Sequence, residues 1–408
     1  MRIALPAAKP CIECGGDAIH HRIQYFTLLI GLAATPFSAL MGRITDGASR
    51  LLPKRDSKGL VAEGLARLGL AELLEEPDDK TLLLDLVLWE EAKKRGIRMR
   101  EFRLLGLPTA SFLATFPGGR RIGFESIPFP ARMEQPVWWI DNKTVMKKKF
   151  RALGLPVARG ESAFSLAKAN RIFKEINGTV IAKPAEGSAS RHTTLHISDE
   201  TALERGFKIA KEVSPLVVIE EELEGSVYRP TLVDGKLVAT IRRDPPRVVG
   251  DGEHTIEELI AQANTHPKRQ GPYFSHIKLT ALGEQELKLQ GLTLQSIPEQ
   301  GRAVYLHPKI NWALGGTTTD VTEKVHPDNK ALFEEIARVL HAPIVGIDFI
   351  TSDISRSWKE TPKCGVIETN GRPFFDNHHL PFEGEPHNVA AVIWDLYQAL
   401  PNKKFDMI

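Results

Sequence analysis

Two short apolar runs near the C-terminus carry oxygen-bearing side chains at spacings that suit a metal site. Residues 342–351 include Asp348, and residues 364–370 end in Glu368 and Asn370. Both runs are rich in β-branched residues, so each predicts a buried strand, and side chains two apart on a strand share a face. If the strands pair as a hairpin, two carboxylates and an amide oxygen converge, a set that suits Mg²⁺. A hairpin with polar ends and no metal is the alternative.

A lysine-rich helix stands far upstream of these strands. Asp141 or Asn142 can cap it, and Gly154 fits its end, with Met146, Phe150 and Leu153 lining one face. Lys143 falls in its first turn. We interpret residues 147–149, three consecutive lysines, as a solvated face.

A second lysine precedes a loop of small residues. Lys183 ends a predicted strand, and Gly187, Ser188, Ala189 and Ser190 follow it. Small residues let backbone N–H groups approach an anion closely, which is the chemistry a triphosphate needs. The loop is not a P-loop, because the order of glycines, lysine and hydroxyl residue is different.

Acidic and basic residues end the strands that follow. Residues 216–220 run as a strand into Glu220, Glu221 and Glu222, and a hairpin turning at Asp234-Gly235 ends in Arg242 and Arg243. The arginines could bind an anion or form a surface pair. Polar residues 371–381 predict a loop, and residues 386–400 a final amphipathic helix.

The N-terminal third of the sequence shows a different pattern of apolar residues. Residues 42–76 show helical spacing of apolar residues, 89–95 fit a helix, and 97–105 an extended segment. Residues 111–116 and 121–127 flank a Pro-Gly-Gly turn, which predicts a hairpin. We therefore expect a helical segment followed by a small α/β domain.

The overall composition is that of a soluble globular protein. The chain has 408 residues, of which 42% are hydrophobic and 25% charged, with a formal net charge of +2. This balance favours neither nucleic-acid nor membrane binding. Three cysteines and no recognisable leader predict a cytoplasmic location.

The motif Cys11-x-x-Cys14, followed by His20 and His21, could be half of a zinc site. The second pair of ligands normally comes after a longer gap, so we favour a surface turn and do not expect zinc here. Residues 25–41 carry no charge but are too short for a bilayer span. We interpret them as a helix that faces the core or a partner chain.

The order of these elements resembles the ATP-grasp ligases over residues 138–400. Tyr228-Arg229, the loops at 248–256 and 315–320, and Val345-Gly-Ile-Asp are similar to the ATP-grasp part of the cyanophycin synthetase family. The fused glutathione synthetases share some of them. Cyanophycin synthetases carry a further Mur-ligase-like domain, whereas this chain ends at Ile408, so we expect no polymer synthesis by this chain alone.

The resemblance implies an α+β, ATP-grasp fold with two lobes whose antiparallel sheets grip ATP. The expected divisions are an N-terminal helical segment (1–79), a small α/β domain (80–137) and the ATP-grasp domain (138–408). The latter divides into a smaller lobe (138–221) and a catalytic lobe (222–408).

The resemblance also assigns roles to residues. Lys143, Lys183 and the loop Gly187, Ser188, Ala189 and Ser190 would bind the nucleotide, with Glu220, Glu221, Glu222 and Leu223 as the hinge at adenine. Asp348, Glu368 and Asn370 would hold two Mg²⁺ ions, with Mn²⁺ as an alternative, and Arg243 or Arg242 would steady the transferred phosphoryl group. Val227, His307 and Phe374 depart from the family pattern. Val227 weakens the expected contact with ribose, and the other two leave the acceptor open.

The implied reaction joins an amino acid or short peptide to an amine through an acylphosphate, with release of ADP and phosphate. A small-molecule kinase and a nucleotide-binding module without ligase activity are the alternatives. Relatives of this kind commonly pair, so we expect a homodimer.

Overall fold

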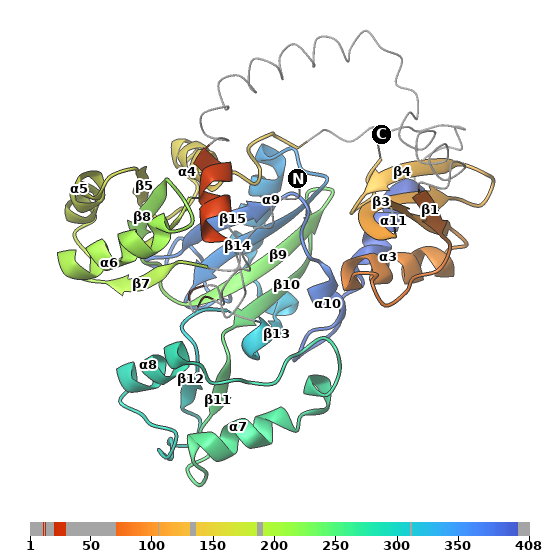
Figure 1. The fold of residues 1–408 in the computed structure, drawn as a ribbon. Coiled ribbons are helices and arrows are strands. Elements are labelled where there is room, and N and C mark those ends of the chain that lie inside the picture. The colour runs from red at the N-terminus through yellow and green to blue at the C-terminus, as the bar shows by residue number, and fades with distance from the viewer. Residues whose placement is uncertain are drawn as a thin grey trace, which may run out of the picture.

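The computed structural model describes residue 11, residue 13 and residues 20–29, 71–104, 106–130, 136–185, 191–310 and 312–398. Three α+β bodies are arranged around a central sheet (Figure 1). Within the described residues, no helix combines the length and the apolar composition that a membrane crossing needs.

The central sheet has five strands in the order β13-β10-β9-β14-β15. Its strands are β9 (Ser226–Val233), β10 (Lys236–Asp244), β13 (Thr317–Asp320), β14 (Ile344–Thr351) and β15 (Gly365–Asn370). All neighbours pair antiparallel. The predicted turn between β9 and β10 is confirmed, because Asp234 and Gly235 both adopt positive φ. Helix α9 (Pro327–Val339) packs on this sheet through Phe333 and Ile336.

A four-stranded antiparallel sheet in the order β5-β8-β6-β7 forms the smaller lobe. It consists of β5 (Gly160–Ala163), β6 (Val180–Pro184), β7 (Thr194–Ile197) and β8 (Val217–Glu221), with helices α5 (Leu166–Ile176) and α6 (Glu200–Lys211). Ser165 and Asp199 cap the two helices, as their side chains accept from the third backbone N–H. Helix α4 (Lys143–Ala152) lies between this lobe and the central sheet (Figure 1).

The four-stranded sheet β1-β2-β3-β4 lies on the other side of the molecule (Figure 1). It contains β1 (Ala71–Leu74), β2 (Arg98–Leu104), β3 (Leu107–Thr115) and β4 (Arg121–Glu125), and it is covered by α3 (Leu83–Lys94). The C-terminal helix α11 (Val389–Gln398) shares its hydrophobic core through Ile393 and Trp394. Residues distant in sequence therefore build one core, while the predicted domain boundaries stay predictions.

A smaller subdomain extends from the central sheet. It contains β11 (Arg247–Val249), α7 (Ile256–Asn264), α8 (Ala281–Leu289), β12 (Ala303–Tyr305) and the short helices Pro267–Arg269 and Trp312–Leu314. The short helix Thr322–Lys324 instead lies against β10 of the central sheet. Thr255 and Glu258 form a capping box at the start of α7.

Several local predictions are wrong. Ala71–Leu74, expected to be helical, pairs with β2 as strand β1, because its partner lies some thirty residues away and leaves no local signal. The helix predicted at residues 89–95 begins six residues earlier, at Leu83, and the predicted loop 371–381 contains helix α10 (Asp376–His379). Leu153 is exposed, since α4 ends one residue before it. The helix at residues 21–29 is described, but the rest of the predicted helix 25–41 lies outside the described residues.

Candidate active site

The β14–β15 hairpin brings two buried or half-buried carboxylates face to face. The antiparallel register sets Asp348 directly opposite Glu368, and Asn370 opposite Gly346. Thr369, between the two ligand candidates, points the other way and donates its hydroxyl to the carbonyl of Ile140. The alternation of a strand thus places Glu368 and Asn370 on the side that faces away from that buried contact.

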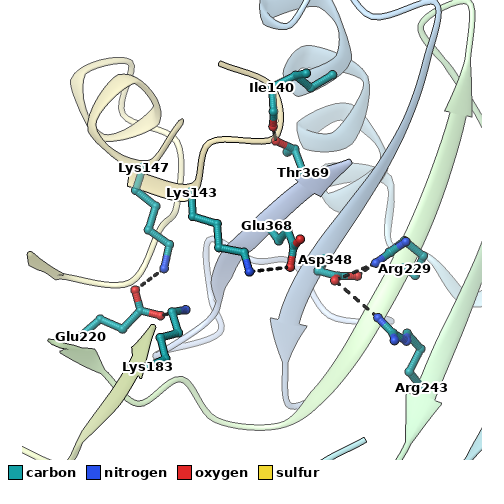
Figure 2. A network of polar contacts seen from close by, with 10 residues as sticks. All are labelled: Ile140, Lys143, Lys147, Lys183, Glu220, Arg229, Arg243, Asp348, Glu368 and Thr369. Atoms are coloured by element: carbon teal, nitrogen blue, oxygen red, sulfur yellow. Dashed lines mark hydrogen bonds and ion pairs between the residues drawn. The ribbon is translucent and has the colours of Figure 1, made fainter. Parts of the chain in front are cut away.

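Two arginines from neighbouring strands hold Asp348. Arg229 on β9 donates through Nε and Nη2, the latter to Oδ2 at 2.8 Å, and Arg243 Nη1 lies 3.4 Å from Oδ2 (Figure 2). Burial alone would raise the pKa of Asp348, but Arg229 and then Arg243 outweigh it and lower that pKa. A Cβ on Gly346 would come within 3.2 Å of the Arg229 side chain, so glycine leaves the space this pair needs.

Helix α4 places Lys143 next to Glu368, the second carboxylate of the hairpin. The Asn142 side chain accepts from the backbone N–H of Val145 at 3.0 Å, which confirms the predicted cap. Met146 and Phe150 are fully buried and fix the helix against the central sheet. Lys143 Nζ lies 3.4 Å from Glu368 Oε2, so the first cation predicted from sequence reaches the predicted metal ligands.

A second ionic cluster lies across from the hairpin, where Glu220 is held between Lys147 and Lys183 (Figure 2). Only 1% of the Glu220 side chain is exposed. Burial would raise the pKa of Glu220, but the two lysines outweigh it and lower that pKa. Burial lowers the pKa of Lys147, and Glu220 opposes this in part. The prediction that Lys147 belongs to a solvated face is wrong, whereas Lys148 and Lys149 are exposed.

The acidic residues after Glu220 contact their own lobe. Glu221 accepts from the backbone N–H and Nε of Arg159 at 2.7 and 2.8 Å, and Glu222 lies 3.0 Å from His196 Nδ1. Leu223 is half-buried. These side chains are therefore occupied by neighbours, and their role at adenine stays a prediction.

The two arginines at the end of β10 separate. Arg242 donates to Asp244 at 2.9 Å, whereas Arg243 turns to Asp348, with its guanidinium 5.8 Å from the centroid of the Trp312 ring. Neighbouring strand residues face opposite sides, so only Arg243 can accompany the hairpin carboxylates. The predicted loop Gly187, Ser188, Ala189 and Ser190 lies outside the described residues.

Comparisons with known proteins agree with this arrangement. The cyanophycin synthetase of Trichormus variabilis is 33% identical over 267 residues, which are 64% of this chain and 29% of that protein. The glutathione biosynthesis bifunctional protein of Clostridium perfringens is 31% identical over 265 residues, 63% of this chain and 34% of that protein. The crystal structure of a bifunctional glutathione synthetase from Pasteurella multocida superposes with a TM-score of 0.56 at 24% identity, covering 78% of this chain and 43% of that one. No family model matches.

This chain has the ATP-grasp fold and is similar in sequence to ATP-grasp ligases. The predicted α+β, ATP-grasp fold is therefore confirmed. The match to the curated relatives spans only about a third of their length. The activities of those complete proteins are therefore not assigned to this chain by the similarity alone.

The ATP-grasp hairpin carries a donor set that fits Mg²⁺. Asp348 and Glu368 offer hard carboxylate oxygens, and a carboxylate has about four lone-pair sites, more than the arginines and Lys143 use. The amide nitrogen of Asn370 is buried and finds no hydrogen-bond partner among the described residues. A polar group that the protein does not supply, such as a phosphate oxygen or a water on the ion, would satisfy it.

Two ATP-grasp site residues escaped assignment from sequence. Arg229 is part of the Tyr228-Arg229 motif that resembles the family, but no role was predicted for it. Only the pairing of β9 with β14 brings it to Asp348. Lys147 lies four residues after Lys143, a spacing that places both on one helix face. That spacing could have indicated that Lys147 lies in the same site as Lys143. Of the three departures from the family pattern, His307 is buried against the backbone of Lys309, Val227 is half-buried, and Phe374 is exposed.

Proposed function

We propose that this chain is an ATP-dependent carboxylate–amine ligase that joins an amino acid or short peptide to an amine. The observation that carries the proposal is the hairpin pair Asp348 and Glu368, faced by Arg229, Arg243 and Lys143. Ionised carboxylates surrounded by cations can hold Mg²⁺ and the phosphates of ATP together. Similarity to a cyanophycin synthetase and a glutathione biosynthesis protein supports the choice of an amide-forming reaction.

The proposed chemistry has two steps. An acceptor carboxylate oxygen attacks the γ-phosphorus, the bond from that phosphorus to the bridging oxygen breaks, and ADP leaves. The amine nitrogen then attacks the acyl carbon, the bond to the phosphate oxygen breaks, and phosphate leaves while the nitrogen gives up a proton. Mg²⁺ would neutralise charge on the phosphate oxygens when bound.

The side chains supply positioning and charge. Lys143 and Lys183 would contact the phosphates and the nucleotide, and Arg243 would stabilise the oxygens of the transferred phosphoryl group. Arg229 keeps Asp348 ionised and oriented, since it binds that carboxylate through two donors. The role first considered for Arg242 falls to Arg243, because Arg242 is bound to Asp244.

A cavity next to the edge strand β13 is the proposed acceptor site. Its volume is about 540 Å³, and its polar lining includes Arg247, Arg269, Thr317 and Glu383. Arg247 and Arg242 share the carboxylate of Asp244, which links the cavity to the end of β10. The Nε atom of Arg269 is buried without a partner among the described residues. The terminal nitrogens of Arg269 donate to the carbonyls of Ser275 and Gly315, so it shapes the wall of the cavity. The guanidinium of Arg247 and the carboxylate of Glu383 suit a zwitterionic acceptor.

The finer features expected from the resemblance belong to the same proposal. They are two Mg²⁺ ions, for which Mn²⁺ could substitute, a homodimer and a cytoplasmic location.

Phosphate and ADP release in mixtures of amino acids and dipeptides tests the ligase. We expect ADP formation that needs Mg²⁺, an acceptor and an amine together, with an amide product by mass spectrometry. A phosphorylated acceptor formed without any amine dependence would establish the kinase alternative instead. In the ligase, Arg247→Ala should raise KM for the acceptor without raising KM for ATP.

A further inference from the structure

Three potential metal ligands outside the candidate active site meet where the N-terminal segment contacts the smaller lobe. They are the thiol of Cys11, the ring of His21 at the start of the helix at residues 21–29, and the ring of His192 just before β7. One ligand atom from each lies within 4.8 Å of the other two. Cys11 and His192 are 181 residues apart in sequence.

The buried histidine presents the correct nitrogen. His192 is fully buried, and its Nδ1 lies 2.9 Å from the carbonyl oxygen of Ile209. A carbonyl only accepts, so Nδ1 carries the proton and Nε2 keeps its lone pair. Nε2 lies 3.7 Å from Cys11 Sγ. A backbone carbonyl that fixes the far nitrogen of a ligating histidine is a common feature of zinc sites.

The spacing of the three atoms is close to that of a zinc shell. With Zn–S near 2.3 Å and Zn–N near 2.0–2.1 Å, neighbouring ligand atoms in a tetrahedron are about 3.3–3.8 Å apart. The separation of Cys11 Sγ from His192 Nε2 already falls in this range. The remaining separations, none above 4.8 Å, need contractions of about 1.5 Å at most, which rotation of the half-buried Cys11 and His21 side chains can supply.

We propose that Cys11, His21 and His192 bind a structural Zn²⁺ ion. Thiolate and imidazole ligands in this combination select zinc over the oxygen-preferring Mg²⁺ of the hairpin. The proposal rests on the three described ligands and replaces the surface turn expected from sequence.

Zinc here would fasten the N-terminal segment to the smaller lobe. The backbone N–H of His192 donates to the carbonyl of Glu13 at 3.2 Å, and the Glu13 carboxylate lies 3.1 Å from Lys309 Nζ. His192 also follows the predicted phosphate loop by two residues in sequence. The ion would therefore anchor the chain where that loop rejoins the lobe, independently of whether the ligase reaction is the one proposed.

Metal analysis of the full chain tests the proposal. After expression with added zinc and exhaustive dialysis, we expect about one tightly held zinc ion per chain by plasma mass spectrometry. Cys11→Ser, His21→Gln and His192→Asn should each lower the zinc content at least several-fold. The asparagine can still donate to the Ile209 carbonyl, so His192→Asn removes the ligand with the least damage to packing.

Matched controls come from the same chain. Cys364→Ser alters another half-buried cysteine, and His196→Gln alters an exposed histidine four residues after His192. Both should keep the zinc. A wild-type chain without bound zinc, or full zinc content in Cys11→Ser and His192→Asn, would overturn the assignment.

Cobalt substitution of the wild-type chain gives a readout that does not depend on any variant folding. A thiolate-to-cobalt charge-transfer band and tetrahedral d–d bands would support the site. Their absence at saturating Co²⁺ would overturn it. A zinc chelator should also lower the thermal midpoint of the wild-type chain but leave that of Cys11→Ser unchanged, because the ion stabilises only the folded state.

Discussion

Buried carboxylates occur in two regions of this protein, and the two regions treat them in opposite ways. Around the nucleotide site, Asp348 and Glu220 are surrounded by arginines and lysines, and their pKa values are lowered despite burial. In the core between α3 and α10, burial, with Glu101 and Asp376 nearby, raises the pKa of Asp85 to about 7. Burial likewise raises the pKa of Asp376 to about 6.

The difference teaches what each region is built to do. A carboxylate that must bind a cation has to be ionised at neutral pH, and the cations around Asp348 keep it so. They also leave a strongly charged site that a metal and a triphosphate can enter without a large reorganisation. Within the described part of the chain, Asp85 and Asp376 have no such cationic partner, so they affect how stability depends on pH.

Removing the charge of Asp348 should have the largest effect. Asp348→Asn deletes a proposed metal ligand and leaves Arg229 and Arg243 facing each other without an anion. We expect ATP turnover to fall at least about 10³-fold, which is roughly 4 kcal/mol of transition-state stabilisation. A coupled assay of ADP release measures it. Glu360→Gln, an exposed carboxylate in the loop between β14 and β15, serves as the control, and equal turnover in both variants would refute the assignment.

Neutralising Glu220 should mainly reduce stability. Glu220→Gln leaves Lys147 and Lys183 together in a buried site, and breaking a buried ion pair in this way costs about 3–5 kcal/mol. Urea unfolding measures the change in the free energy of unfolding. The control is Glu224→Gln, whose exposed partner Lys363 lies at 2.5 Å, since a surface pair contributes about 0–1 kcal/mol. A loss no larger than that of the control would contradict the buried cluster.

Asp85, in the core beside α3, predicts that stability falls as pH rises, which is opposite in sign to the effect of a carboxylate whose pKa is lowered. Because the pKa of Asp85 is raised to about 7, its contribution is fully present below its ordinary pKa and is lost as the pH rises through about 7. Asp85 should therefore make stability fall between pH 5 and 7 by at most about 1.4 kcal/mol per pH unit, and Asp376 adds to this fall up to about pH 6. Asp85→Asn should flatten this slope, whereas Glu90→Gln, on the exposed side of the same helix, should keep it. A parent slope that survives in Asp85→Asn would show that another group causes it.

Signals confined to a few neighbouring residues allowed much of the fold to be predicted. The Asn142 cap, the Asp234-Gly235 turn and the alternation of β15 each depend on residues adjacent in sequence. The same is true of Lys143 as a cation on the first turn of a helix. The order of these elements then carried the family resemblance.

Contacts between distant segments could not be predicted in this way. Lys147 was taken for a solvated lysine because its partner Glu220 is 73 residues away. Arg229 meets Asp348 only through the pairing of β9 with β14, and His192 contacts Cys11, which is 181 residues away in sequence. In each case a charged or polar side chain is buried against a partner that no local pattern reveals.

The Mg²⁺ dependence of binding a non-hydrolysable ATP analogue tests the central claim most directly. Titration calorimetry on the full chain, with and without Mg²⁺, measures it without requiring the acceptor to be known. We predict that Mg²⁺ tightens binding at least tenfold in the wild-type chain, about 1.4 kcal/mol, and that Glu368→Gln and Asp348→Asn lose this gain. Undetectable binding by the wild-type chain, or an equal gain from Mg²⁺ in all three proteins, would contradict the assignment of the hairpin as the metal–nucleotide site.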